Sequence, residues 1–159
     1  MTITMTHEQY KKVMLWKRVQ ESAQLWYQCV AQAKDYCRQV RNKLIPPFWG
    51  AAYTWRLRRS IVFEGHESIS GFATVPVGSI VIFKPYATVQ IKKPWDFLWK
   101  TVKLTSAWHV AVVDYTDNSG VIRVIEQNGA TWNGDGKWWN AIRLRWYKGK
   151  DEVAGFILQ

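Results

Sequence analysis

HVAVVDYTDNSGVIRVIEQ, residues 109–127, is the stretch that decides the fold. It contains two runs rich in β-branched residues, 109–115 and 121–127, and the five residues between them are Thr, Asp, Asn, Ser and Gly. Apolar runs on either side of such a cluster are typical of antiparallel strands joined by a turn. The sequence therefore predicts a β-hairpin at this place.

The register of this hairpin sets which polar side chains meet. A turn centred between Asp117 and Asn118 makes His109 face Glu126, with Cβ atoms roughly 4.5 to 5.5 Å apart. Since side chains alternate along a strand, Asn128 lies on the same face as Glu126. A carboxylate or an amide can then fix the tautomer of the imidazole, as the third member of a catalytic triad does. A slip of one residue in the register would separate these groups.

Helical and extended patterns divide the rest of the chain. Residues 7–43 have the apolar spacing of a helix, either continuous or broken near 22–28, and the two prolines at 46–47 end it. Residues 49–59 fit a second, shorter helix. Strand patterns lie at about 79–84, 109–115, 121–127, 141–147 and 153–158. Helices followed by an antiparallel sheet of about five to six strands predict an α+β domain.

A long insert at 84–108 separates the first of these strands from the hairpin. It contains prolines, several aromatic residues and five lysines. Long segments of this kind are often binding elements or lids. Trp95 to Leu104 either forms a short amphipathic helix, which covers a groove or rests on a membrane interface, or packs on the edge of the sheet. We slightly favour the edge of the sheet.

The two cysteines have different expected roles. If both lie on one helix, Cys29 and Cys37 are separated by about 12 Å of helical rise, which is too far for a disulfide. Cys37 fits an inert buried hydrophobe. Cys29 stands at or near the start of the helix, unless the helix runs through from His7. A helix N-terminus favours a thiolate.

Length and charge bound the class of protein. A chain of 159 residues with 48% hydrophobic content fits one domain, 1–159, with a helical extension at 1–23. The net charge of +10 is concentrated at 1–60 and 137–150. It favours an anionic partner, such as a wall polymer, a membrane surface or nucleic acid, or else it is a solubilising surface.

Several functional classes have no signal in the sequence. No stretch has the pattern of a secretion signal or the length of a transmembrane segment. His7 and His66 show no spacing that would indicate a zinc site, and no phosphate-binding glycine loop is present. We therefore expect no metal, no cofactor and no specific nucleic-acid partner.

Four motifs together resemble a known family. They are Tyr27-Gln28-Cys29-Val30, Gly78-Ser79 at the start of a strand, His109-Val110-Ala111-Val112-Val113, and Ile125-Glu126-Gln127-Asn128 followed by Trp132-Asn133-Gly134-Asp135-Gly136. They resemble the cysteine, histidine-dependent amidohydrolase/peptidase (CHAP) domain, especially the catalytic domains of bacteriophage endolysins. The resemblance covers about 24–159 and implies a papain-like fold, in which helix and sheet meet at the groove that joins nucleophile and base.

The resemblance implies roles for individual residues. Cys29 would be the nucleophile, His109 the base, Glu126 the orienting acid and Asn128 a further polar partner. Gln28 would contribute to the oxyanion hole, together with the backbone N–H of Cys29. Of the eleven tryptophans, we expect Trp108, beside the proposed base, and Trp132, after the acid motif, to line the substrate groove.

The implied activity is hydrolysis of amide bonds in bacterial peptidoglycan, by an N-acetylmuramoyl-L-alanine amidase or an endopeptidase. With no second module visible, targeting to the wall would come from this domain, a partner subunit or a virion. We expect a protein made in the host cytoplasm that reaches the wall after holin-type release or as a virion component. The alternative is a catalytically silent, basic module that binds an anionic polymer, either a wall polymer or nucleic acid.

The chain also departs from the family pattern. Trp108 replaces the usual glycine before the histidine, and Ser79 replaces an aspartate. Some relatives hold calcium with an aspartate two positions after the cysteine, where this chain has Ala31, so we expect no calcium site of that kind.

Overall fold

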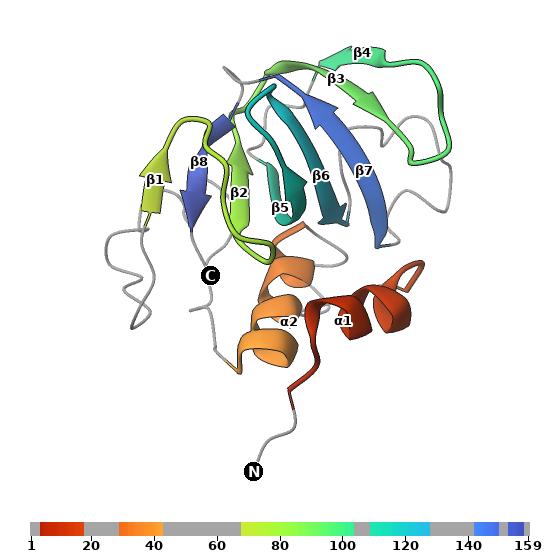
Figure 1. Ribbon diagram of the computed structural model, residues 1–159, viewed down its shortest axis with the longest axis vertical. Coiled ribbons are helices and arrows are strands. Elements are labelled where there is room, and N and C mark those ends of the chain that lie inside the picture. Colours follow the sequence, from red (N-terminus) through yellow and green to blue (C-terminus); the bar gives the residue numbers. More distant parts are fainter. Residues whose placement is uncertain are drawn as a thin grey trace.

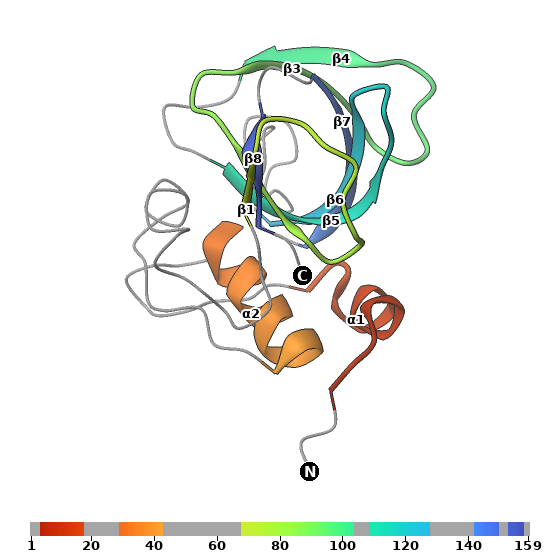
Figure 2. The same cartoon turned by 60° about the vertical axis from the view of Figure 1, so that its left-hand side comes forward.

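The computed structural model describes residues 4–17, 29–42, 68–103, 109–127, 142–149 and 153–157. Within them the chain is an α+β fold in which two helices pack on one strongly curved antiparallel sheet (Figures 1 and 2). The helices are α1 (His7–Met14) and α2 (Cys29–Arg41). The strands are β1 (Ser68–Ser70), β2 (Ile80–Phe83), β3 (Thr88–Lys92), β4 (Lys100–Lys103), β5 (His109–Thr116), β6 (Val121–Glu126), β7 (Arg143–Lys148) and β8 (Val153–Ile157).

The strand order in the sheet is β1-β8-β2-β5-β6-β7-β3-β4. All five predicted strands are present, and their ends lie within two residues of the expected positions. Over the described residues the sheet nevertheless has eight strands instead of five to six, because β1, β3 and β4 were not predicted.

The insert packs on the edge of the sheet, as we favoured. β3 and β4 form a hairpin, and β3 pairs with β7 so that Ile91 lies opposite Tyr147. The alternative, a helix over Trp95–Leu104, is excluded, because residues 100–103 are a strand. Val89 and Ile91 alternate with more exposed neighbours, which is the pattern of a strand with one buried face.

The N-terminal helix is short. A capping box formed by Thr6 and Gln9 begins α1, and the helix ends at Met14. The prediction of one helix from 7 towards 43 is therefore wrong. Trp16 adopts a positive φ of 69°, its N–H donates to the carbonyl of Ile142 at 2.6 Å, and the N–H of Ile142 donates to Lys17 at 2.7 Å. This pairing with the segment before β7 ends the helix despite its apolar periodicity. The predicted break near 22–28 and the predicted helix at 49–59 lie outside the described residues.

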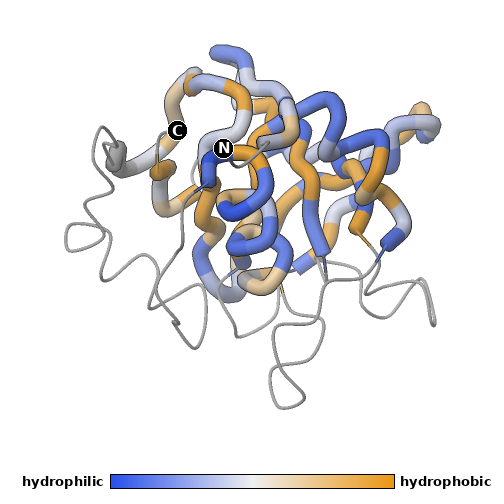
Figure 3. Tube along the Cα trace, turned by 90° about the horizontal axis from the view of Figure 1, so that it is seen from below, coloured by the Kyte–Doolittle hydropathy of each residue, from blue (hydrophilic) through white to orange (hydrophobic). Residues whose placement is uncertain are grey.

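Each face of the sheet has its own apolar cluster. On β2, Ile80 and Ile82 pack with Tyr36 and Cys37 of α2, whereas Phe83 belongs to the cluster on the other face. That second cluster includes residues of both β8 and β3, strands far apart in the sheet order, because the sheet curls around it (Figure 2). Seen from the helix side, the largely hydrophilic outer turns of the helices cover hydrophobic strands (Figure 3).

The central hairpin contains a β-bulge. Val112 pairs with Ile125, whereas the predicted register paired it with Arg123. Val113 pairs with Val124 and Tyr115 with Arg123, so Asp114 is the extra residue. The prediction that His109 directly faces Glu126 is therefore wrong by two residues. Because side chains alternate along a strand, a displacement of two residues still leaves His109 and Glu126 on the same face of the sheet. Without the bulge, the register that pairs Tyr115 with Arg123 would continue along the hairpin and would put the two side chains on opposite faces.

Candidate functional site

Helix α2 places Cys29 beside His109, at the start of β5. Cys29 is the first residue of the helix and is partly buried against the cluster that α2 shares with the sheet. Cys37 lies eight residues further along the same helix and is buried in that cluster. Neither cysteine takes part in a disulfide. Cys37 is thus a packing residue, and Cys29 is the cysteine that reaches the polar residues of the site.

His109, the first residue of β5, is held on two sides. Its ring stacks on Phe83 with centroids 5.9 Å apart, and its Nε2 lies 2.8 Å from Oε2 of Glu126. The side chain of Cys29 forms a hydrogen bond with the same imidazole. Since Nε2 is engaged by the carboxylate, Nδ1 is the nitrogen that remains for the sulfur. The structure thus brings together Cys29, His109 and Glu126 in the order thiol, imidazole, carboxylate.

The charges of these groups are strongly coupled. Burial alone would lower the pKa of His109, but hydrogen bonds to Cys29 and Glu126 outweigh it and raise that pKa to about 10. Burial would raise the pKa of Glu126, yet the charge of Arg145 and the hydrogen bond to His109 lower it to about 2. At neutral pH the pair is therefore an imidazolium and a carboxylate. By linkage, the interaction that favours the imidazolium also favours a thiolate at Cys29.

Two residues of β7 complete the surroundings of Glu126. The Tyr147 hydroxyl donates to Oε2 at 2.5 Å, and Nε of Arg145 lies 3.1 Å from Oε1 as an ion pair. The side chains of Arg145 and Glu126 are 1% and 0% exposed, so this pair is shielded from water. Both carboxylate oxygens are thus engaged, which fixes the orientation of the carboxylate toward His109.

Arg145 and Tyr147 were not among the site residues predicted from the sequence. Residues 137–150 were expected to add to a basic surface, but Arg143 and Arg145 are buried. A signal was available: Arg143, Arg145 and Tyr147 alternate along one predicted strand. Charged residues at the inward positions of a core strand indicate a buried polar network.

A second polar cluster surrounds the bulge. Oδ1 of Asp114 lies 2.6 Å from Nε2 of His7 and 3.0 Å from Nζ of Lys11, and Oδ2 accepts from Nε of Arg123. Nδ1 of His7 is 2.7 Å from the Tyr36 hydroxyl. The spacing around His7 indicated no function for it; in the structure it joins α1 to both α2 and β5.

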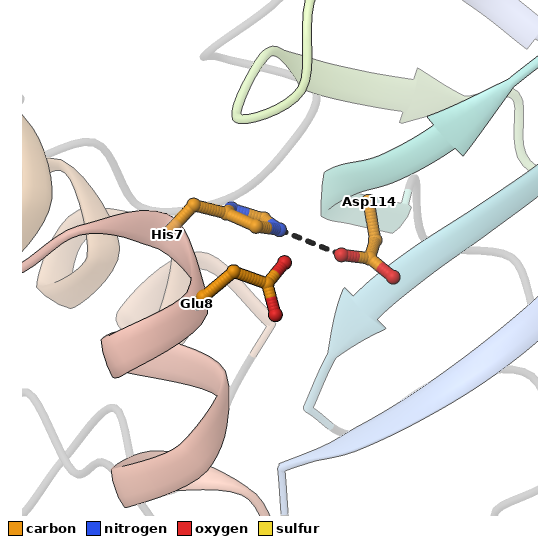
Figure 4. A group of neighbouring side chains, drawn as sticks. All are labelled: His7, Glu8 and Asp114. Carbon is orange, nitrogen blue, oxygen red and sulfur yellow. Dashed lines mark hydrogen bonds and ion pairs between the residues drawn. The ribbon is translucent and has the colours of Figure 1, made fainter.

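This cluster has the composition of a metal site but not its electrostatics. His7, Glu8 and Asp114 each point one ligand atom into the same small region (Figure 4). However, the Lys11 ammonium lies 3.3 Å from Glu8 and 3.0 Å from Asp114, and Arg123 holds the second oxygen of Asp114. Cationic side chains thus already neutralise the acids. Although burial opposes it, the hydrogen bond to His7 and the charges of Lys11 and Arg123 lower the pKa of Asp114. The cluster is a structural link.

Four predicted site residues, Gln28, Trp108, Asn128 and Trp132, lie outside the described residues. The Gly78-Ser79 motif lies within them and has a structural explanation. Gly78 has a φ of +90°, and a Cβ there would come within 2.5 Å of Arg41 and 2.7 Å of Tyr36. Only glycine fits at this entry into β2.

Comparison with known families agrees with the geometry. Residues 19–128, more than half of the chain, match the CHAP domain. The chain therefore belongs to the CHAP-domain family, and this membership indicates a hydrolase of peptidoglycan, an amidase or peptidase in general. None of the curated proteins is significantly similar to the chain. In the described part of the chain, no helix is both long and apolar enough to cross a membrane.

Proposed function

We propose that this protein is a bacteriolytic, endolysin-like enzyme that cleaves amide bonds of peptidoglycan with Cys29 as its nucleophile. The observation that carries the proposal is the continuous series of contacts from Cys29 through His109 to Glu126. Arg145 and Tyr147 hold the far end of this series in a buried position. A thiol, an imidazole and a fixed carboxylate are the groups that thiol hydrolysis needs.

The mechanism follows from the charges of these groups. The Cys29 thiolate attacks the carbonyl carbon of the scissile amide, and the backbone N–H of Cys29, with Gln28, stabilises the oxyanion. Protonated His109 gives its proton to the leaving amine, so the C–N bond breaks and a thioester remains. Neutral His109 then takes a proton from water, which attacks the thioester and releases the carboxylic acid and Cys29. Glu126 stabilises the imidazolium before the proton transfer and again when it re-forms.

The first test removes the sulfur nucleophile. Cys29→Ala should reduce the release of new amino groups from purified sacculi by at least about 10³-fold, because the covalent route is lost. Cys37→Ala is the matched control on the same helix and should keep its activity. Circular dichroism and thermal melting should show that both variants fold. Wall hydrolysis by a folded Cys29→Ala variant at the normal rate would exclude the proposed nucleophile.

The scissile bond needs a separate experiment. Digested sacculi analysed by mass spectrometry distinguish an amidase, which exposes the N-terminal alanine of the stem peptide, from an endopeptidase, which exposes new ends within the stem or cross-bridge. Both products are compatible with the same three catalytic groups. Tight binding of sacculi with no new termini would instead support the silent binding module.

A further inference from the structure

The loop between β3 and β4 carries the most exposed hydrophobic side chains among the described residues. We call residues 93–99, Lys-Pro-Trp-Asp-Phe-Leu-Trp, the β3–β4 tip. Phe97 is 96% exposed, Leu98 is 83% exposed and Trp95 is 60% exposed. The tip lies at the edge of the molecule, beyond β7 (Figures 1 and 2). Neighbouring exposed apolar residues of this size indicate an interaction site.

The tip has a defined conformation. The N–H of Asp96 donates to the carbonyl of Lys93 at 3.0 Å, and the N–H of Lys93 donates to the Asp96 carboxylate at 3.1 Å. The Trp95 ring stacks on Trp16, which follows α1, with centroids 6.4 Å apart. These contacts close the turn and anchor it to the N-terminal segment, so Phe97 and Leu98 are presented by a preorganised loop.

Positive charges surround the base of the tip. Residues 84–103 contain five lysines and one acid, Asp96, whose carboxylate is engaged within the turn. The Nζ atoms of Lys92 and Lys148 lie 5.1 Å and 6.0 Å from the centroid of Trp99, and that of Lys93 lies 5.9 Å from the centroid of Trp95. Ammonium groups thus lie beside both indole rings of the tip, which also carries the two purely apolar side chains of Phe97 and Leu98.

We propose that the β3–β4 tip is a membrane anchor that inserts Phe97 and Leu98 into the outer acyl region of an anionic lipid surface. Indole rings favour the headgroup level, and lysines contact phosphate groups there. A polysaccharide fits less well, because Phe and Leu offer no polar atoms to its hydroxyl groups. The anchor does not depend on the proposed hydrolase activity, although it would hold such an enzyme between membrane and wall.

The test is co-sedimentation of the full chain with lipid vesicles. Vesicles of phosphatidylcholine and phosphatidylglycerol in equal amounts should bind the protein more strongly than vesicles of phosphatidylcholine alone. Phe97→Ser combined with Leu98→Ser should weaken this binding at least about tenfold, because two inserted side chains are lost. Lys92→Glu combined with Lys93→Glu should remove the preference for anionic vesicles. Val77→Ser, an exposed apolar position in the turn before β2, and Cys29→Ala are controls that should bind normally.

Thermal melting identifies any variant that fails to fold, and the single variant Leu98→Ser then replaces the double one, with a smaller loss expected. Unchanged vesicle binding by the folded tip variants would overturn the proposal, as would absence of binding by the natural sequence. A variant that loses binding to lipid-free sacculi but not to vesicles would assign the tip to the wall. Loss of a dimer in analytical ultracentrifugation, with vesicle binding unchanged, would assign it to self-association. Either result overturns the membrane anchor.

Discussion

Glu126 shows how a fully buried carboxylate stays ionised beside a histidine. One oxygen accepts from Tyr147 and faces His109, and the other is paired with Arg145. An unpaired buried charge would cost several kcal/mol, so its partners decide its protonation state. The hydrogen bonds that orient the carboxylate therefore also set the pKa of the imidazole.

Removal of the carboxylate charge should change the pH dependence of the site. In Glu126→Gln the pKa of His109 should fall by about 1 to 3 units, because a carboxylate favours the imidazolium. His109 then loses its proton at a lower pH than in the natural chain, where its pKa is about 10. The pH profile of hydrolysis measures this shift, and the rate of Cys29 alkylation should change with it, with Cys37 as an internal reference. Equal, slow alkylation of both cysteines in the natural chain would argue against an activated thiolate.

Glu8→Gln is the matched control for this variant, because the Glu8 side chain is largely exposed on α1. Its pH profile should match that of the natural chain. If both glutamine variants left the alkaline limb unchanged, the carboxylate of Glu126 would have no influence on the imidazole.

Arg145 should act as a positioning residue. In Arg145→Met the carboxylate of Glu126 loses its buried cation, so its pKa should rise and the acid limb of the pH profile should move to higher pH. Arg145→Lys keeps the charge and should recover part of the activity and the original acid limb. A loss of activity with an unmoved pH profile in both variants would indicate a purely structural role.

At the level of elements, the bulge in β5 and the link to α1 form one feature. The extra residue of the bulge, Asp114, restores the register that puts His109 and Glu126 on one face. The carboxylate of Asp114 also pairs with His7 and Lys11 of α1. The N-terminal helix is therefore tied by charge to the strand that positions the base.

Asp114→Asn should destabilise the fold by about 2 to 4 kcal/mol at neutral pH, because His7, Lys11 and Arg123 lose the buried carboxylate charge with which they pair. The pKa of Asp114 is lowered in the folded state, so its contribution is fully present above the unfolded value of about 3.9 and is lost as the pH falls through the folded value. Urea unfolding at neutral and acidic pH measures both effects. Asp117→Asn, in the exposed turn of the same hairpin, should change stability much less. A pH-independent difference would show that the charge is not responsible.

At the level of the whole molecule, the candidate site joins residues that pack on opposite faces of the sheet. Cys29 comes from a helix packed on one apolar cluster, whereas His109 stacks on Phe83 of the other. The first residue of β5 can bridge the two because it stands at the end of its strand. The position of His109 at the start of β5 thus brings the imidazole and the thiol together.

The net charge of +10 should assist attack on anionic walls. Between about 0.01 M and about 1 M salt the Debye length falls from about 30 Å to about 3 Å, so hydrolysis of intact walls should decline. Hydrolysis of a small, neutral peptide substrate should change little over the same range. Walls stripped of anionic polymers provide the control, and an equal salt response with all three substrates would exclude electrostatic recruitment.

Prediction from sequence succeeded where a pattern is local. The alternation along 109–115 and 121–127 identified the central strands, and the helical spacing around Cys37 identified its buried position. It failed at β3 and β4 because Pro94 and the surrounding aromatic residues masked the alternation, and the strand that pairs with β3 lies some 50 residues further along the chain. The end of α1 was missed for the same reason, since Ile142 provides the competing hydrogen bonds.

The sequence by itself determined that the chain has an α+β fold and contains a thiol, an imidazole and a carboxylate in an order compatible with hydrolysis. Side-chain periodicity suffices for this because it depends on neighbours within a few residues. Only the tertiary structure decided that Arg145 and Tyr147 hold Glu126, that His7 meets Asp114, and that the β3–β4 tip remains exposed. These contacts join residues distant along the chain, and their energies exist only once burial removes the competing water.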